Sequence, residues 1–222
     1  RRVHALLRGG EPVPVAADVQ RREALEVRDR ELARRLAGIV ARGLLEQVTP
    51  LSTDCGALCG KACCGGDSGN SDGRFNNADS LCDSSEETGM YLFPGEKPLF
   101  LNRPGFQVVP SEFVYGGKRA DLLLCSGLCR RSARPLSCRI FPLIPYFREN
   151  AGLKIIIDPR AYSLCPLTEK EAYPFLNPSF QRKTESVFRL LLKFSEVRAF
   201  LEGLSDILDD YLKFEPKGAI RI

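Results

Sequence analysis

Residues 55–64 read CGALCGKACC, and residues 125–138 read CSGLCRRSARPLSC. Together with Cys82 and Cys165, these two stretches hold all nine cysteines of the 222-residue chain. Thiolates are strong ligands for zinc and for iron–sulfur clusters, and such sites collect ligands from separate parts of a chain. The grouping therefore predicts a metal centre, around which the other segments are expected to pack.

A disulfide framework is the main alternative to a metal centre. An odd number of cysteines would leave at least one thiol over. Residues 1–20 carry arginines and prolines where a secretory signal would be apolar. A chain of this length also buries a core without covalent links. We therefore expect a cytoplasmic metal-binding protein, with disulfides or inert buried thiols as the other interpretations.

The composition narrows the range of partners. With 44% apolar and 27% charged residues, the chain resembles an ordinary globular protein. Its net charge of +4 is too small to indicate nucleic-acid binding. No window approaches the roughly 20 apolar residues that cross a membrane. The expected partners are a metal ion and a second protein, with neither nucleic acid nor a membrane.

Apolar residues recur at helical spacing near both ends of the chain. Residues 17–48 predict a long helix that packs one face on the core and exposes a charged face. Residues 179–214 predict C-terminal helices, which Gly203 is expected to divide. Between them, proline-broken apolar runs in residues 90–124 and the run LKIIID at 153–158 predict short strands.

The expected fold class is therefore α+β. It has an irregular, cysteine-rich metal-binding centre with short strands, flanked by long N- and C-terminal helices. Three segments follow from this arrangement. Residues 1–50 form an N-terminal helical segment, residues 51–170 form the cysteine-cluster domain, and residues 171–222 form C-terminal helices packed on the same core.

Eight cysteines are the candidate metal ligands, and Cys82 is set apart because it lies in a loop rich in Gly, Ser and Asn. The candidates are Cys55, Cys59, Cys63, Cys64, Cys125, Cys129, Cys138 and Cys165. A zinc site needs four ligands, and a four-iron, four-sulfur cluster also needs four thiolates. The spacing leaves open two metals, or one metal with some structural cysteines. Zinc is the first expectation, with iron or an iron–sulfur cluster as the alternative.

Arginines crowd the second cysteine group. A four-thiolate zinc site carries a charge of about −2, and Arg134 and Arg139 are candidates to offset it. Pro135 and Pro142 restrict the backbone on either side of Cys138. We therefore expect Cys138→Ser to lose metal and stability, and Cys82→Ser to be tolerated.

The sequence leaves open whether the protein is an enzyme. Its single histidine, His4, lies near the start of the chain, which argues against a triad or a Cys–His nucleophile. The adjacent acidic pairs at residues 86–87 and 209–210 point apart on a helix and are expected to be solvated. No catalytic residue is assigned.

The order of these motifs resembles one known family. The features that carry the resemblance are the pair Cys63-Cys64 after spaced cysteines, the segment RPxxCRxFP at residues 134–142, and Cys165-Pro166. They are similar to the YkgJ-like cysteine-cluster proteins, associated with zinc or iron chelation. The family's first motif is closer to CxxCxxCC, whereas this chain has CxxxCxxxCC.

The resemblance spans roughly residues 55–166 and implies metal chelation. The metal is expected to be structural and to support a protein-interaction surface. Some relatives resemble flagellin lysine methylases, which implies, as an alternative, an accessory component of a protein-modifying enzyme. An iron–sulfur redox protein is the other alternative function.

Overall fold

The computed structural model describes most of the chain from residue 37 onward. The described residues are 27, 31, 34, 35, 37–51, 53–57, 59, 60, 63, 89–125, 130–169 and 176–214. The chain divides into two compact units, residues 1–33 and residues 34–222. All but two of the described residues belong to the second unit, and the fold below is the fold of that unit.

The larger sheet is antiparallel and has the strand order β1-β3-β2. Strands β2 (Phe106–Tyr115) and β3 (Lys118–Cys125) form a hairpin, and β1 (Gly89–Tyr91) pairs with the other edge of β3. The hairpin closes through Gly116 and Gly117, whose φ angles of 51° and 76° suit a tight two-residue turn. Glycine adopts these angles without steric cost, which explains the Gly-Gly pair.

The smaller sheet is the antiparallel pair of β4 (Leu143–Arg148) and β5 (Gly152–Ile157). Strand β5 confirms the strand predicted from LKIIID. Asp158 follows it and is buried, and its side chain accepts a hydrogen bond from the backbone N–H of Arg160 at 3.0 Å. The chain thereby leaves the sheet and enters the 3-10 turn η5 (Pro159–Ser163).

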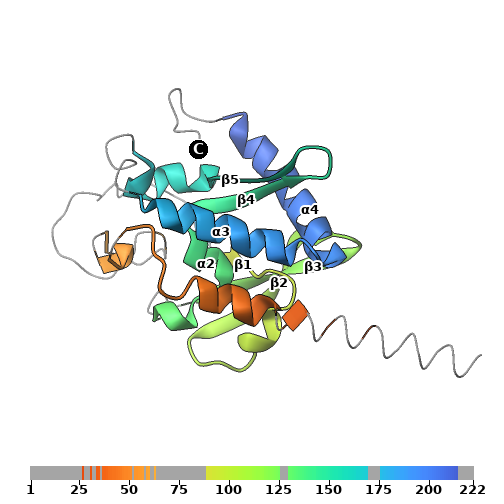
Figure 1. The fold of residues 1–222 in the computed structure, drawn as a ribbon. Coiled ribbons are helices and arrows are strands. Elements are labelled where there is room, and N and C mark those ends of the chain that lie inside the picture. The colour runs from red at the N-terminus through yellow and green to blue at the C-terminus, as the bar shows by residue number, and fades with distance from the viewer. Residues whose placement is uncertain are drawn as a thin grey trace, which may run out of the picture. The chain divides into compact units, whose positions relative to one another are not determined.

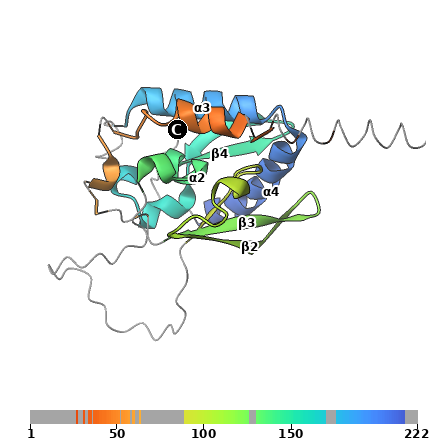
Figure 2. The same cartoon turned by 90° about the horizontal axis from the view of Figure 1, so that it is seen from below.

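Helices pack against both sheets. Helix α3 (Pro178–Leu191) lies on β4 and β5, and α4 (Ser195–Leu212) lies on β4 and also contacts β2. Figure 2 shows α4 between β4 and the β2–β3 hairpin, with α3 on the opposite side of β4. Residues 37–44 form a further helix, which runs beside α3 in both views (Figure 1 and Figure 2).

The hydrophobic core is centred on aromatic rings between α4 and the larger sheet. Phe200 of α4 is fully buried, and its ring centroid lies 5.3 Å from that of Phe93, 5.2 Å from that of Phe113 and 5.0 Å from that of Tyr115. Rings at such distances and tilted angles attract one another in addition to being buried. This core contains no cysteine among the described residues.

Gly203 has a different role from the one expected. Helix α4 continues through it, and the break between the C-terminal helices comes at residues 192–194. A Cβ atom at Gly203 would lie 2.9 Å from the ring of Phe113. The glycine therefore allows α4 to approach β2 closely.

The expectation of long terminal helices around an irregular centre is wrong. The protein is α+β, but the described middle of the chain forms two regular antiparallel sheets, and the C-terminal helices are core elements packed on them. Within residues 17–48 the structure describes one continuous helical run, at 37–44, and most of the remainder lies outside the described residues. Pro110 and Pro145 did not break the strands because each lies in an edge strand, where a missing N–H is tolerated.

None of the helices in the described part of the chain combines the length and apolar character needed to cross a bilayer.

Candidate metal centre

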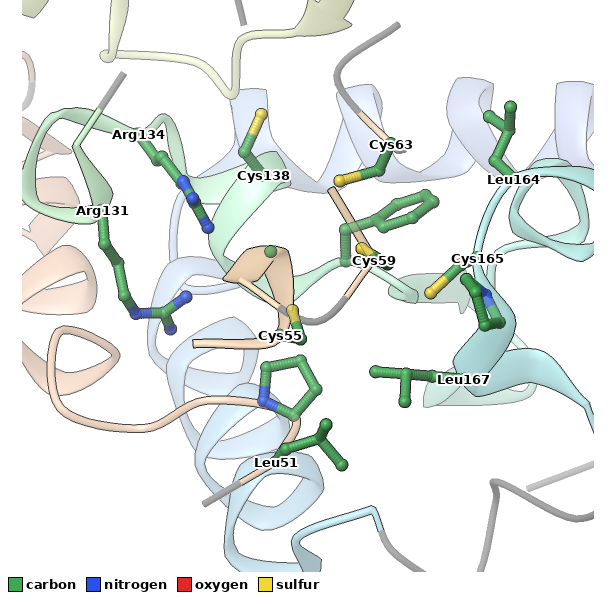
Figure 3. Close-up of a pocket in the computed structure, with 14 residues that line it drawn as sticks. Leu51, Cys55, Cys59, Cys63, Arg131, Arg134, Cys138, Leu164, Cys165 and Leu167 are labelled. Carbon is green, nitrogen blue, oxygen red and sulfur yellow. The ribbon is translucent and has the colours of Figure 1, made fainter. Parts of the chain in front are cut away.

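A cavity of about 150 Å³ gathers cysteines from three separate segments of the chain. The cysteines that line it are Cys55, Cys59, Cys63, Cys138 and Cys165 (Figure 3). Most of the remaining wall is apolar and is formed by residues 50–51, Phe141 and residues 164–167. The structure thus brings one member of the second cysteine group, Cys138, and the separate Cys165 to the same cavity as the first group.

The first cysteine segment is wound into a tight turn. Cys55 starts the 3-10 helix η1 (Cys55–Ala57), and the N–H of Cys59 donates to the carbonyl oxygen of Cys55 at 3.3 Å. The N–H of Gly56 donates to Oδ1 of Asp54 at 3.3 Å, which anchors the start of the turn. A spacing of four residues brings Cys55 and Cys59 to one side of this turn. Cys63 lines the same cavity.

Cys165 is held between two 3-10 turns. Its N–H donates to the carbonyl oxygen of Ala161 at 2.8 Å, and it precedes η6 (Pro166–Thr168). Its own carbonyl oxygen accepts hydrogen bonds from the N–H and the Oγ1 of Thr168, at 3.0 and 2.8 Å. The backbone of Cys165 is thus fixed on both sides, and its thiol faces the cavity (Figure 3).

Cys138 lies on the short helix α2 (Leu136–Ile140), whose first backbone N–H donates a hydrogen bond to a buried carboxylate. Oε1 of Glu96 accepts from the N–H of Leu136 at 2.8 Å, and Oε2 accepts from the N–H of Phe93 at 3.1 Å. Burial raises the pKa of Glu96, and these two hydrogen bonds act in the opposite direction. In Figure 3 the sulfur of Cys138 points away from the sulfurs of the other four cysteines. Its assignment as a ligand therefore stays a prediction.

The thiols in the cavity influence one another electrostatically. Burial raises the pKa of Cys165 to about 11, the N–H of Leu167 lowers it, and the neighbouring thiols of Cys55 and Cys59 raise it further. Burial also raises the pKa of Cys55, with Asp54 and Cys59 adding to the rise. Arg134 and Arg131 act against it. Burial and the neighbouring groups thus favour the neutral thiols of Cys55 and Cys165.

The two arginines expected to offset thiolate charge have different roles. Arg134 lines the cavity, and its Nη1 lies 3.5 Å from Oδ1 of Asp54. The guanidinium of Arg139 instead donates to backbone carbonyl oxygens, including those of Arg134 at 3.0 Å and Ser132 at 2.8 Å. Arg134 is therefore placed to compensate a charged centre, whereas Arg139 joins segments of backbone.

The remaining candidate ligands are placed differently. Cys125 ends β3 and is not among the residues that line the cavity. Cys64, Cys129 and the separately treated Cys82 lie outside the described residues. Cys55, Cys59 and Cys165 are free thiols. As they are placed, no three His, Cys, Asp or Glu side chains within the described ranges form a group that could hold a metal ion.

Sequence reasoning missed Glu96. The residue is 2% exposed and caps the helix that carries Cys138, yet it stands in a GEKP turn, where a charged side chain is normally solvated. Its partner Leu136 is 40 residues further along the chain, so no local pattern could reveal the contact.

Comparison with protein-family models, with curated proteins and with solved structures finds no match for this chain.

Proposed function

We propose that this protein binds a metal through thiolates of the cavity, with zinc as the first candidate. The observation that carries the proposal is the meeting of five cysteines from three segments around one space. Four thiolates suffice for a structural zinc site, so the cavity supplies enough donors. The metal would join the 55–63 turn, α2 and the segment around Cys165, and would thereby support a surface for a protein partner.

The chemistry of the cavity fits a soft cation. Its wall is mainly apolar apart from the thiols and the two arginines, and sulfur is a preferred ligand for zinc and iron. Arg134 and the N–H of Leu167 favour negative charge on the sulfurs. The sulfurs would have to move together to reach bonds of roughly 2.3 Å. Such closure on the ion is common, because metal binding and folding are coupled.

A cobalt titration tests this proposal directly. The full chain is reduced, stripped of metal and titrated with Co²⁺ without oxygen, and Zn²⁺ is then added. We expect intense visible bands typical of tetrahedral Co²⁺ with thiolate ligands, which Zn²⁺ abolishes at one equivalent per site. A chain alkylated on its cysteines is the control. Weak bands typical of octahedral Co²⁺, identical in the alkylated chain, would refute the proposal.

An iron–sulfur cluster is the second candidate, because a four-iron, four-sulfur cluster is also held by four thiolates and the cavity offers five cysteines. The chain purified without oxygen would then be brown and absorb near about 400 nm. A colourless chain containing zinc alone would reject this candidate.

We also propose a cytoplasmic location. Free thiols such as Cys55, Cys59 and Cys165 persist in reducing compartments and are oxidised elsewhere. A role beside a protein-modifying enzyme rests on the sequence resemblance alone.

Metal affinity should rise steeply with pH. The raised pKa values of Cys55 and Cys165 mean that both thiols are protonated near neutral pH, and each must lose its proton to bind metal. Each proton released makes affinity rise about tenfold per pH unit, so these two thiols alone predict at least about 100-fold per unit. Zinc competition assays at about pH 6, 7 and 8 measure this slope, and an affinity independent of pH would contradict it.

Bound metal should also raise the melting temperature. Free metal at 1,000 times its Kd adds about 4 kcal/mol to the free energy of unfolding when it binds only the folded chain. For a chain of this size that corresponds to about 8–16 °C. Calorimetry with and without Zn²⁺ measures the shift. Equal melting temperatures at saturating zinc would show that the metal has no structural role.

A further inference from the structure

Two arginines join the segment that precedes Cys55 to the segment that carries Cys138. Arg131 and Arg139, here called the arginine clamp, both donate to backbone carbonyl oxygens of residues 42–48. Both come from residues 131–139, a segment that includes the 3-10 turn η4 (Arg131–Ala133) and most of α2. The clamp thus connects the segment that leads into the Cys55 turn with the segment that carries Cys138.

Arg131 donates hydrogen bonds to the turn that follows the helix at residues 37–44. Its Nη2 donates to the carbonyl oxygens of Leu45, at 3.1 Å, and Val48, and its Nε donates to that of Glu46 at 3.3 Å. These carbonyl oxygens lie in the turn after the helix, outside its hydrogen-bond pattern, and therefore need a donor from elsewhere. The planar guanidinium supplies several donors in fixed directions, which the single ammonium of lysine does not.

Arg139 makes the second connection, from inside the protein. It is 2% exposed, and its Nη1 donates to the carbonyl oxygen of Arg42 at 3.0 Å. Its Nη2 donates to the carbonyl oxygen of Ser132 at 2.8 Å, and Nη2 of Arg42 donates to the same oxygen at 3.3 Å. The side chains of Arg42 and Arg139 therefore cross between the same two segments in both directions.

We propose that the arginine clamp is a positioning device for the thiol cavity. It sets where the Cys55 turn lies relative to α2, so it determines metal affinity without touching the metal. Arg131 also lines the cavity, where its charge favours the thiolate of Cys55. This inference rests on the proposed metal-binding function. Loss of a group that orients metal ligands typically lowers affinity 10- to 100-fold.

The test compares Arg131→Lys with two controls in the full, reduced chain. Lysine keeps the charge but loses the fork that reaches three carbonyls. Arg130→Lys makes the same replacement at the exposed neighbour. Ser205→Ala removes the buried acceptor of the Phe147 N–H, at 2.9 Å, in α4, whose residues do not line the cavity. Co²⁺ affinity is measured at a temperature where all variants are folded, and hydrogen exchange of residues 45–59 is measured in the metal-free chains.

We expect Arg131→Lys to lower Co²⁺ affinity at least tenfold and to speed exchange in residues 45–59, with both controls unchanged. If Arg131→Lys binds Co²⁺ as tightly as the parent chain, or if Ser205→Ala loses as much affinity, the proposed positioning role of the clamp is wrong. If the parent chain binds no Co²⁺, the proposed function fails. Exchange then decides the clamp separately: faster exchange confined to Arg131→Lys supports it, and unchanged exchange rejects it.

Discussion

Replacing Cys165 with serine should lower the metal affinity of the chain by more than about 100-fold. Losing a group that only hydrogen-bonds to a metal ligand lowers metal affinity by up to about 100-fold. Here a ligand itself would be lost, so the decrease should be larger. The backbone of Cys165 is fixed on both sides, and the nearby thiols of Cys55 and Cys59 help to raise its pKa. A neutral serine hydroxyl is a poor substitute for a thiolate. Competition with a zinc-binding dye, at a temperature where both chains are folded, measures the change.

Cys125→Ser is the matched control for this substitution. It makes the same chemical change at the end of β3, at a residue that does not line the cavity, although the sequence placed Cys125 among the ligands. We expect it to retain the parent affinity. Loss of metal in Cys125→Ser with full metal in Cys165→Ser would mean that the binding site lies elsewhere.

Replacing Phe200 with alanine should cost about 3–5 kcal/mol in the free energy of unfolding. Phe200 is fully buried, and three aromatic rings surround it, so the change would leave a cavity between α4 and the larger sheet. In a chain of this size the loss corresponds to about 6–20 °C in melting temperature. Urea unfolding monitored by circular dichroism measures it.

Phe214→Ala is the control for the core substitution. Phe214 is 85% exposed, and its removal should change stability by less than about 0.5 kcal/mol. A Phe200→Ala chain as stable as the parent would contradict the description of the core. Because this core holds no described cysteine, the metal-free chain should keep its sheets and C-terminal helices, and metal should order the cysteine segments in addition.

The helices and strands that depend on local pattern were predictable from sequence. The helical spacing of residues 179–214 and the apolar run of β5 both correspond to elements of the structure. The break at Gly203 was wrongly predicted because the glycine serves a contact with Phe113, 90 residues earlier in the chain. The sequence also predicted short strands in residues 90–124, where the structure has β1, β2 and β3. The length of β2 was underestimated because proline signals a break, and only the sheet order shows that β2 is an edge strand that tolerates Pro110.

In the candidate site, too, the sequence revealed what depends on local pattern and not what depends on long-range contacts. The clustering of cysteines is visible in the sequence, and it indicated a site built from thiols. Five of the predicted cysteines do line the cavity. The arginine roles depend on tertiary packing: Arg131 bonds to carbonyls at least 83 residues earlier in the chain. Charge alone suggested that Arg139 would face thiolates, whereas it bonds to backbone carbonyl oxygens.

The most direct test of a metal centre in the cavity is the metal content of the full chain purified without oxygen. Elemental analysis is applied to the parent chain, Cys165→Ser and Cys125→Ser. Stoichiometric zinc or iron in the parent chain and in Cys125→Ser, with its loss in Cys165→Ser, is the predicted result. A folded, reduced parent chain that contains no metal and takes up neither zinc nor iron would contradict the metal centre.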